Sequence, residues 1–108
     1  MRQLFIALFF FALTSVASAE TVTVKYRDTP VDLKHFECHD LVSSFVNHGC
    51  YDKKNQYLVL LLKTTRYHWC EVDEGTWKAL LAADSKGGYF NANIKGKFDC
   101  RTRGVPIY

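Results

Sequence analysis

Hydrophobic residues occupy every position from 57 to 62, an unbroken apolar stretch of strand length. Residues 53–56 before it are polar, and residues 63–65 after it are polar as well. A second stretch, residues 66–72, is rich in aromatic and β-branched side chains. Two such stretches joined by a short polar segment predict a β-hairpin.

The register of this hairpin decides which side chains share a face of the sheet. A turn over residues 63–66 places Leu62 opposite Tyr67. The same turn places Leu60 opposite Trp69, and these four side chains share one face. The other face carries Val59, Leu61, His68 and Cys70. Both faces are apolar, so we expect both to be covered by other parts of the chain.

Further strands are predicted before the hairpin. Residues 43–52 indicate a strand, and Gly49 is a candidate for a bulge where the alternation fails. Residues 20–27 alternate apolar and polar side chains, which is typical of a half-buried strand, here an added edge strand. Residues 31–40 are mixed, and we expect them to be irregular. The candidates for inward-facing side chains in the second strand are Phe45, Val46 and Tyr51.

One helix is predicted to cover the face that carries Leu60 and Trp69. Asp73 is a good N-cap, and the helix is expected to stop at the Gly87-Gly88 pair. Its side chains at helical spacing are Trp77, Leu80, Leu81 and Asp84. The predicted fold class is therefore α+β, with an antiparallel meander of three to four strands packed on one main helix and a short second helical turn.

Residues 1–19 have the pattern of a removable export signal. Arg2 precedes an apolar run, and Ala17-Ser18-Ala19 fits the small-residue site of signal peptidase. The apolar run is about 10 residues, half of the about 20 that a membrane-spanning helix needs, so we expect no transmembrane anchor after cleavage. The expected location is the periplasm or the medium.

Size and charge limit the remaining chain further. Residues 20–108 allow one domain with one modest core, and we expect a monomer. The formal net charge of the full chain is +3 at pH 7, one unit of which belongs to Arg2. This excess is too small to predict a nucleic-acid partner, because such binding normally needs a dense basic stripe. The partner is therefore expected to be an unidentified protein or small ligand.

All four cysteines, Cys38, Cys50, Cys70 and Cys100, follow the predicted signal. An even number of cysteines in a short exported chain predicts a disulfide framework, here of two bridges. In a meander the strands of Cys50 and Cys70 flank a central strand and lie about 9.5 Å apart. A disulfide needs Cα atoms within about 7 Å, so a bond between these two is disfavoured. Cys70 is then bonded to Cys38 or to Cys100, and the spacing leaves both open.

Several short patterns occur together between residues 43 and 98. They are Ser43-Ser44, Tyr51-Asp52, the alternating Leu58, Leu60 and Leu62, the pair Tyr67 and Trp69, and the motif Ala83-x-Ser85-x-Gly87-x-Tyr89-Phe90-Asn91-x-x-Ile94. On these patterns the sequence resembles the KTSC domain, a small module found at the C-terminus of some lysyl-tRNA synthetases and as a stand-alone bacterial protein. The resemblance implies a compact strand-meander and helix module over residues 43–100, with no established activity and a suggestion of RNA binding. It divides the rest of the mature chain into an N-terminal extension, residues 20–42, and a tail, residues 101–108.

Two groups of side chains could carry metal or nucleophile chemistry. His35, Cys38 and His39 have residue types that zinc prefers, and His68 and Cys70 point the same way in a strand. Cysteines oxidised to disulfides can serve neither purpose, so the exported context favours neither hypothesis. Asp73 and Glu74 are explained by their place at a helix start. We therefore expect no catalytic residues, no metal and no cofactor.

The remaining candidates are aromatic and small polar side chains of the recognised motif. Tyr67, Trp69, Tyr89 and Phe98 could form a stacking platform, although aromatic residues on a sheet face are more often core. Ser85 and Asn91 are expected to satisfy backbone groups near helix ends. The sequence thus predicts an exported, non-enzymatic binding or accessory domain. The alternatives are a zinc-binding protein and a nucleic-acid-binding module.

Overall fold

The computed structural model describes residues 20–108, and the predicted export signal lies outside them. The described chain is an α+β fold, as predicted. Its strands are β1 (Thr21–Val22), β2 (Val31–Asp32), β3 (Glu37–Asp40), β4 (Val46–Asp52), β5 (Tyr57–Leu62) and β6 (Thr65–Trp69). Its helices are α1 (Glu74–Ala82), α2 (Lys86–Asn93) and α3 (Cys100–Arg103).

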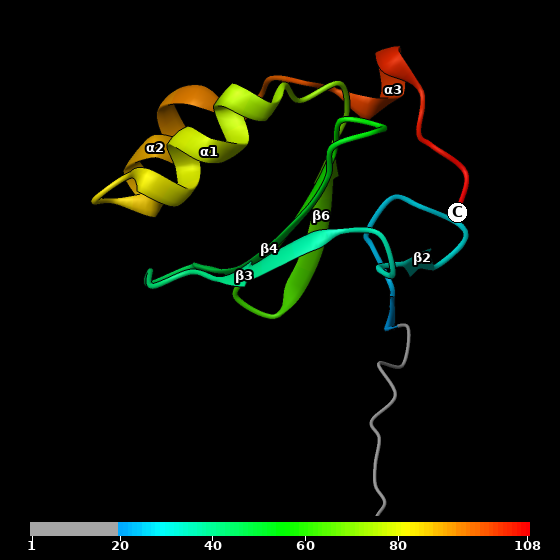
Figure 1. Ribbon diagram of the computed structural model, residues 1–108, viewed down its shortest axis with the longest axis horizontal. Helices are drawn as coiled ribbons and strands as arrows, with labels where there is room; N and C mark the ends of the chain where they lie inside the picture. Colours follow the sequence, from blue (N-terminus) through cyan, green and yellow to red (C-terminus); the bar gives the residue numbers. More distant parts are fainter. Residues whose placement is uncertain (1–19) are drawn as a thin grey trace, which may run out of the picture.

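The main sheet has four antiparallel strands in the order β3-β4-β5-β6, and β1 pairs with β2 in a separate two-stranded sheet. Helices α1 and α2 lie side by side on one side of the main sheet, while the β1–β2 segment lies on the other (Figure 1). The sheet is therefore covered on both faces, as its apolar hairpin predicted.

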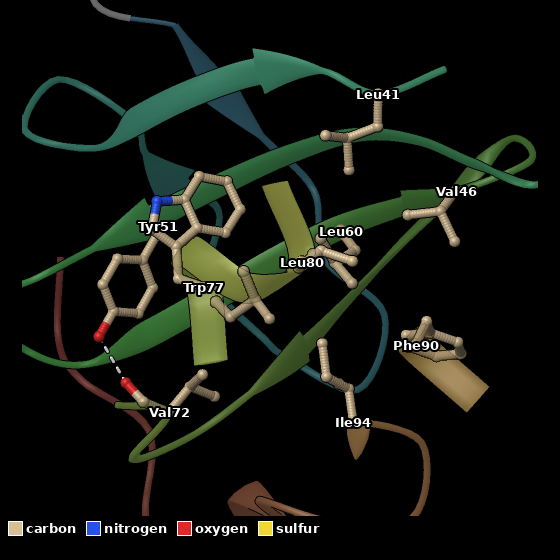
Figure 2. Close-up of a cluster of buried hydrophobic side chains, with 10 residues drawn as sticks. Leu41, Val46, Tyr51, Leu60, Val72, Trp77, Leu80, Phe90 and Ile94 are labelled. Atoms are coloured by element: carbon tan, nitrogen blue, oxygen red, sulfur yellow. Dashed lines mark hydrogen bonds between the residues drawn. The ribbon is translucent and has the colours of Figure 1, made fainter. Parts of the chain in front are cut away.

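The face under the helices forms the helix-side core (Figure 2). Trp77 of α1 is only 1% exposed, and its ring stacks on that of Tyr51 with 5.5 Å between the ring centroids. The Tyr51 hydroxyl donates to the backbone carbonyl of Val72 just before α1 (Figure 2). This core joins the sheet to both helices through Val46, Leu58, Leu60, Leu80, Phe90 and Ile94.

The opposite face forms the extension-side core. Residues 20–33 supply four of its buried side chains, and the main sheet and α3 supply the rest. Its members are Val22, Val24, Val31, Leu33, Cys50, Tyr57, Val59, Cys70 and Cys100. Segments at the two ends of the described chain thus close the second face of the sheet.

Two disulfides stabilise this arrangement, one between neighbouring strands of the main sheet and one that fastens α3 to the end of β6. They join Cys70 to Cys100 and Cys38 to Cys50. Because β5 separates β4 from β6, a bond between Cys50 and Cys70 is excluded, as expected. Of the two partners left open for Cys70, the structure has Cys100. Cys38 lies directly opposite Cys50 because β3 pairs with β4.

Two expectations for the N-terminal part were wrong. Residues 31–40, expected to be irregular, contain β2 and β3. All four side chains of β3 are exposed, so the strand has no apolar alternation to reveal it. The predicted strand over residues 20–27 is reduced to β1, because Tyr26 has a φ of 70° and turns the chain away.

The register of the hairpin also differs from the prediction. Leu60 pairs with Tyr67 and Leu58 pairs with Trp69, which is a shift of two residues. Lys63 adopts a φ of 59°, so a two-residue turn replaces the predicted longer one. The predicted faces survive the shift, because side chains in a strand alternate with a period of two.

Gly49 is not the bulge, which lies between Val46 and His48. A Cβ atom on Gly49 would lie 2.9 Å from Leu60 Cδ2 and 3.1 Å from the Trp77 ring. A glycine is therefore needed at this position so that the Trp77 ring can lie close to the backbone of β4.

The predicted helix begins correctly but ends earlier than predicted. Asp73 is its N-cap, and α1 stops at Ala82 because Ala83 is extended. Gly87 and Gly88 lie in the first turn of α2, whose N-cap Ser85 accepts a hydrogen bond from the Gly88 N–H. A Cβ atom on Gly87 would lie 2.6 Å from the Phe45 ring, so this glycine lets α2 approach the chain before β4. The second helical element is thus a helix of 8 residues.

Candidate functional site

Four candidate residues, Trp69, Tyr89, Phe90 and Ile94, belong to the helix-side core or pack against it. Phe90 and Ile94 are buried, and Trp69 and Tyr89 are partly buried against them. The rings of Trp69 and Phe90 meet edge to face with 5.4 Å between their centroids. Phe98, the other candidate for a stacking platform in this region, packs on the same core. These side chains hold the fold together, and only parts of them remain available to a ligand.

The small polar residues of the motif line a recess of about 350 Å³ between residues 42–45 and the start of α2. Ser43 Oγ accepts from the Val46 N–H at 3.2 Å, and Ser85 Oγ accepts from the Gly88 N–H at 3.0 Å. Lys86 Nζ donates to the backbone carbonyls of Leu81 and Ala83. Their polar atoms mainly satisfy the backbone at helix and strand ends, which is the architectural role expected for them. Asn91 is exposed at the rim of this recess.

A larger concavity, here called the edge groove, runs along the free edge of β6. Its volume is about 520 Å³. Two chain segments attach to β6 on either side of it. The Lys25 N–H donates to the Arg66 carbonyl at 2.8 Å, and the Cys70 N–H donates to the Phe98 carbonyl at 2.8 Å. The groove is lined by Tyr26, Tyr67, His68, Trp69 and residues 96–101.

The backbone of His68 lies open in this groove. Outward-facing residues alternate along an edge strand, and Arg66 and Cys70 are the two that already bond to the flanking segments. His68 lies midway between them, so its N–H and C=O also face outward. Within residues 20–108 neither group has a further backbone partner. The groove therefore offers one donor and one acceptor of an unpaired strand edge.

The walls of the groove are aromatic and its surroundings are basic. Lys25 Nζ lies 5.5 Å from the ring centroid of Tyr26 and 6.0 Å from that of Tyr67. At the other end the guanidinium of Arg103 lies 5.7 Å from the Phe98 ring centroid and 3.8 Å from a Glu71 carboxylate oxygen. The one carboxylate lining the groove, Asp99, is paired with Arg101 at 2.7 Å. Hydrogen bonds from Arg101 lower the pKa of Asp99 to about 2, so this pair stays ionised and its charges cancel. Lys97 in the lining and the neighbouring Lys25 give the groove its positive charge.

The imidazole of His68 is turned toward the extension-side core. Its Nδ1 accepts from the Tyr57 hydroxyl at 2.7 Å, and that hydroxyl lies 3.4 Å from an Arg27 donor nitrogen. Burial lowers the pKa of His68, and the charge of Arg27 lowers it further, while Asp99 acts in the opposite direction. His68 is therefore held in its neutral form as a hydrogen-bond acceptor.

A pH-dependent stability follows from this environment. Because the folded-state pKa of His68 lies below its unfolded value, the unfolded chain binds the proton more readily. Stability is complete above the unfolded pKa of about 6.5 and decreases as the pH falls toward the folded pKa. We expect the urea midpoint of the wild-type protein to fall between about pH 8 and about pH 5, and His68→Gln to flatten this slope. Equal slopes for the two proteins would contradict this assignment.

The cysteines of both groups considered for metal or thiol chemistry are oxidised to disulfides. Cys38 is bonded to Cys50, and His39 Nε2 lies 2.7 Å from a Glu37 carboxylate oxygen, so the alternative zinc set of His35, Cys38 and His39 has no thiolate. In the part of the chain that the structure describes, the one compact group of possible metal ligands is Cys38, His48 and Cys50, and it includes this same disulfide. Cys70 is likewise bonded to Cys100, which removes the nucleophile from its pairing with His68.

Sequence reasoning found only part of the edge groove. Tyr67, Trp69 and Phe98 were candidates, but Lys25 and Tyr26 were assigned to a strand, and the other residues of 96–101 were not predicted to lie at this edge. These segments meet only because they attach to β6 at Arg66 and Cys70. The pairing of Cys70 with Cys100 was the one sequence signal that could have brought residues 96–101 to this edge.

No helix within residues 20–108 has the length and apolar character needed to cross a bilayer.

Comparison with known proteins supports the family resemblance. The family model of the KTSC domain matches residues 42–98. The structure is similar to the crystal structure of a KTSC domain protein from Yersinia pestis, with a TM-score of 0.56 and 29% sequence identity. This similarity covers 59% of the present chain and 92% of the Yersinia chain. A search of curated proteins found no match. With more than half of its length matched by the family model, the chain belongs to the KTSC domain family.

Proposed function

We propose that this chain is an exported, disulfide-stabilised binding module whose edge groove takes an acidic segment of a partner protein. One observation carries the proposal: the backbone N–H and C=O of His68, which face away from β5 and have no partner in the backbone of residues 20–108, lie in a groove with aromatic walls and positive charge. A strand edge pairs with the backbone of an extended peptide, and the charges select its side chains.

The state of the reactive side chains supports binding in preference to catalysis. The four cysteines are joined in disulfides, and the His68 imidazole accepts a hydrogen bond from Tyr57. Asp73 caps α1, and the hydrogen bonds it accepts from Thr76 lower its pKa. The cysteines, His68 and Asp73 are therefore occupied by structural interactions.

The disulfides also support export, because such bonds persist in oxidising compartments. We expect the protein recovered from the periplasm or the medium to begin at Glu20, and intact-mass measurement with and without reductant checks both cleavage and oxidation. A full-length chain with free thiols in the cytosol would contradict export.

The binding proposal can be tested with a defined acidic probe, an acetylated hexaglutamate peptide. We expect saturable binding to the oxidised mature protein in isothermal titration calorimetry, weakening as salt increases. Replacing Lys25 and Lys97 together by glutamate is expected to weaken binding by at least about tenfold, because like charges then face the peptide. Lys78→Glu on α1 is the control outside the groove, and it should change the affinity by less than about twofold.

The same titration separates a protein partner from nucleic acid. A single-stranded oligonucleotide would also find aromatic rings and positive charge in this groove. Strong, steeply salt-dependent binding of the oligonucleotide together with no binding of hexaglutamate would replace the peptide proposal with the nucleic-acid alternative.

A further inference from the structure

Residues 104–108, here called the arm, differ from one another in how far they are buried against the rest of the protein. The arm leaves α3 and ends beside the segments that precede the main sheet (Figure 1). Within residues 20–108 its one backbone hydrogen bond runs from the Gly104 N–H to the Cys100 carbonyl. Ile107 is 94% exposed and Val105 is 44% exposed, whereas Pro106 is half-buried and Tyr108 is 36% exposed. The arm is therefore held mainly by Pro106 and Tyr108.

The Tyr108 side chain is partly exposed and lies in a surface pocket formed by Phe36, Tyr57, Arg27 and Asp52. Its ring centroid lies 5.2 Å from that of Phe36 and 5.7 Å from that of Tyr57. The Arg27 guanidinium lies 5.5 Å from the Tyr108 centroid. The Tyr108 hydroxyl donates to Asp52 Oδ2 at 2.6 Å. Burial and the Asp52 carboxylate both raise the pKa of Tyr108, which keeps the phenol protonated as a donor.

The pocket is organised by contacts that do not involve Tyr108. The buried Asp52 carboxylate accepts from the Lys54 N–H at 3.0 Å and from the Asn55 side-chain amide at 2.7 Å. The Tyr57 hydroxyl donates to His68, and Arg27 Nε donates to the Thr29 carbonyl at 2.9 Å. Contacts other than those with Tyr108 thus help to hold ring, cation and acceptor in position, which favours preorganised binding.

The base of the arm is exposed. Gly104 has a φ of 78°, and no neighbouring atom lies within 4 Å of the position where a side chain would start. Release of the arm therefore breaks chiefly the contacts of Pro106 and Tyr108.

We propose that this pocket is a tyrosine-recognition site, that the arm is its exchangeable internal occupant, and that a tyrosine-bearing segment of a partner protein replaces it. The site is separate from the edge groove and does not depend on the function proposed for it. The specificity comes from a phenol that fills the aromatic and guanidinium walls and donates to Asp52. A short tether holds the arm at an effective concentration in the millimolar range, so an outside tyrosine must compete with it.

The test uses the oxidised mature protein with the substitution Tyr108→Ala, which empties the pocket without shortening the chain. The probe is a synthetic peptide with the sequence of the arm, acetyl-GVPIY-amide, titrated while NMR amide spectra are recorded. We expect saturable shifts around Phe36, Asp52 and Tyr57, and an affinity about tenfold higher than for wild type, where the arm competes. A peptide ending in phenylalanine should bind at least about tenfold more weakly, because it cannot donate to the carboxylate.

Two further variants test the same pocket, one by removing an aromatic wall and one by weakening the arm as competitor. Phe36→Ala added to Tyr108→Ala should abolish the shifts. If Tyr108→Ala does not fold, Tyr108→Phe weakens the internal competitor, and the arm peptide should then bind more tightly than to wild type. Absence of saturable binding to folded Tyr108→Ala, or equal binding of both peptides, would overturn the proposal. Equal affinity of the arm peptide for Tyr108→Phe and wild type would do the same.

Discussion

Replacing Cys70 and Cys100 together by alanine is expected to lower the free energy of unfolding by about 3 to 4 kcal/mol. The bond closes a sequence separation of 30 residues, and such a link removes much of the entropy of the unfolded chain. Both cysteines are also buried in the extension-side core. Urea unfolding followed by tryptophan fluorescence measures this loss. It is a large part of the about 5 to 15 kcal/mol typical of a whole domain.

The matched control is Cys38→Ala with Cys50→Ala. This bond spans only 12 residues and starts on the exposed strand β3, so we expect a smaller loss of about 2 to 3 kcal/mol. The two variants should differ more clearly in binding. Cys100 lines the edge groove and the Cys70 N–H holds Phe98 beside it, so hexaglutamate binding should weaken only in the first variant. A wild-type midpoint for the Cys70 and Cys100 variant would contradict the stabilising role of this bond.

Replacing Trp77 by alanine is expected to cost about 3 to 5 kcal/mol, the range for removing a large buried aromatic side chain. Trp77 is 1% exposed, stacks on Tyr51 and lies against Gly49, so its removal leaves a cavity in the helix-side core. The variant should unfold at a much lower urea concentration.

Lys78→Ala is the control from the same helix. Lys78 is exposed and makes one 3.5 Å ion pair with Glu74, so its replacement should change stability by less than about 0.5 kcal/mol. A Trp77→Ala protein as stable as Lys78→Ala would show that α1 does not anchor the helix-side core.

The two cores have different sources in the sequence. The helix-side core consists of residues 41–94, nearly all within the span that matches the KTSC domain. The extension-side core takes Val22, Val24, Val31 and Leu33 from before that span and Cys100 from after it. This KTSC domain therefore carries extra segments over its second sheet face, and Cys100 is bonded to β6 through Cys70.

The sequence predicted the elements that have a clear apolar run or a clear capping residue. The apolar run at 57–62 became β5, and Asp73 became the N-cap of α1. The apolar character of Val59 predicted that the second face is covered, because an exposed face would carry polar side chains at such positions.

The sequence could not predict elements whose signals depend on tertiary contacts. Strand β3 exposes all its side chains, and it forms because its backbone pairs with β4. Gly87 and Gly88 had the pattern of a helix end, yet Phe45 requires a small residue at Gly87 and Ser85 caps a new helix there. In each case a local rule was outweighed by packing between segments distant in sequence.

The same reason limited prediction of the candidate site. The edge groove depends on the register of β6, which decides that the backbone of His68 faces outward. It also depends on Lys25 and Phe98 attaching to β6 from opposite ends of the described chain. Side-chain patterns report neither of these backbone contacts.

The most direct test of the proposed binding role is an NMR titration of the oxidised wild-type mature protein with hexaglutamate. We expect saturable shifts concentrated at His68, Trp69 and residues 96–101 along the edge groove. We expect Ser85 and Asn91 at the polar recess to stay unperturbed. Shifts centred on that recess, or no saturable shifts at low salt, would contradict the proposed binding role of the edge groove.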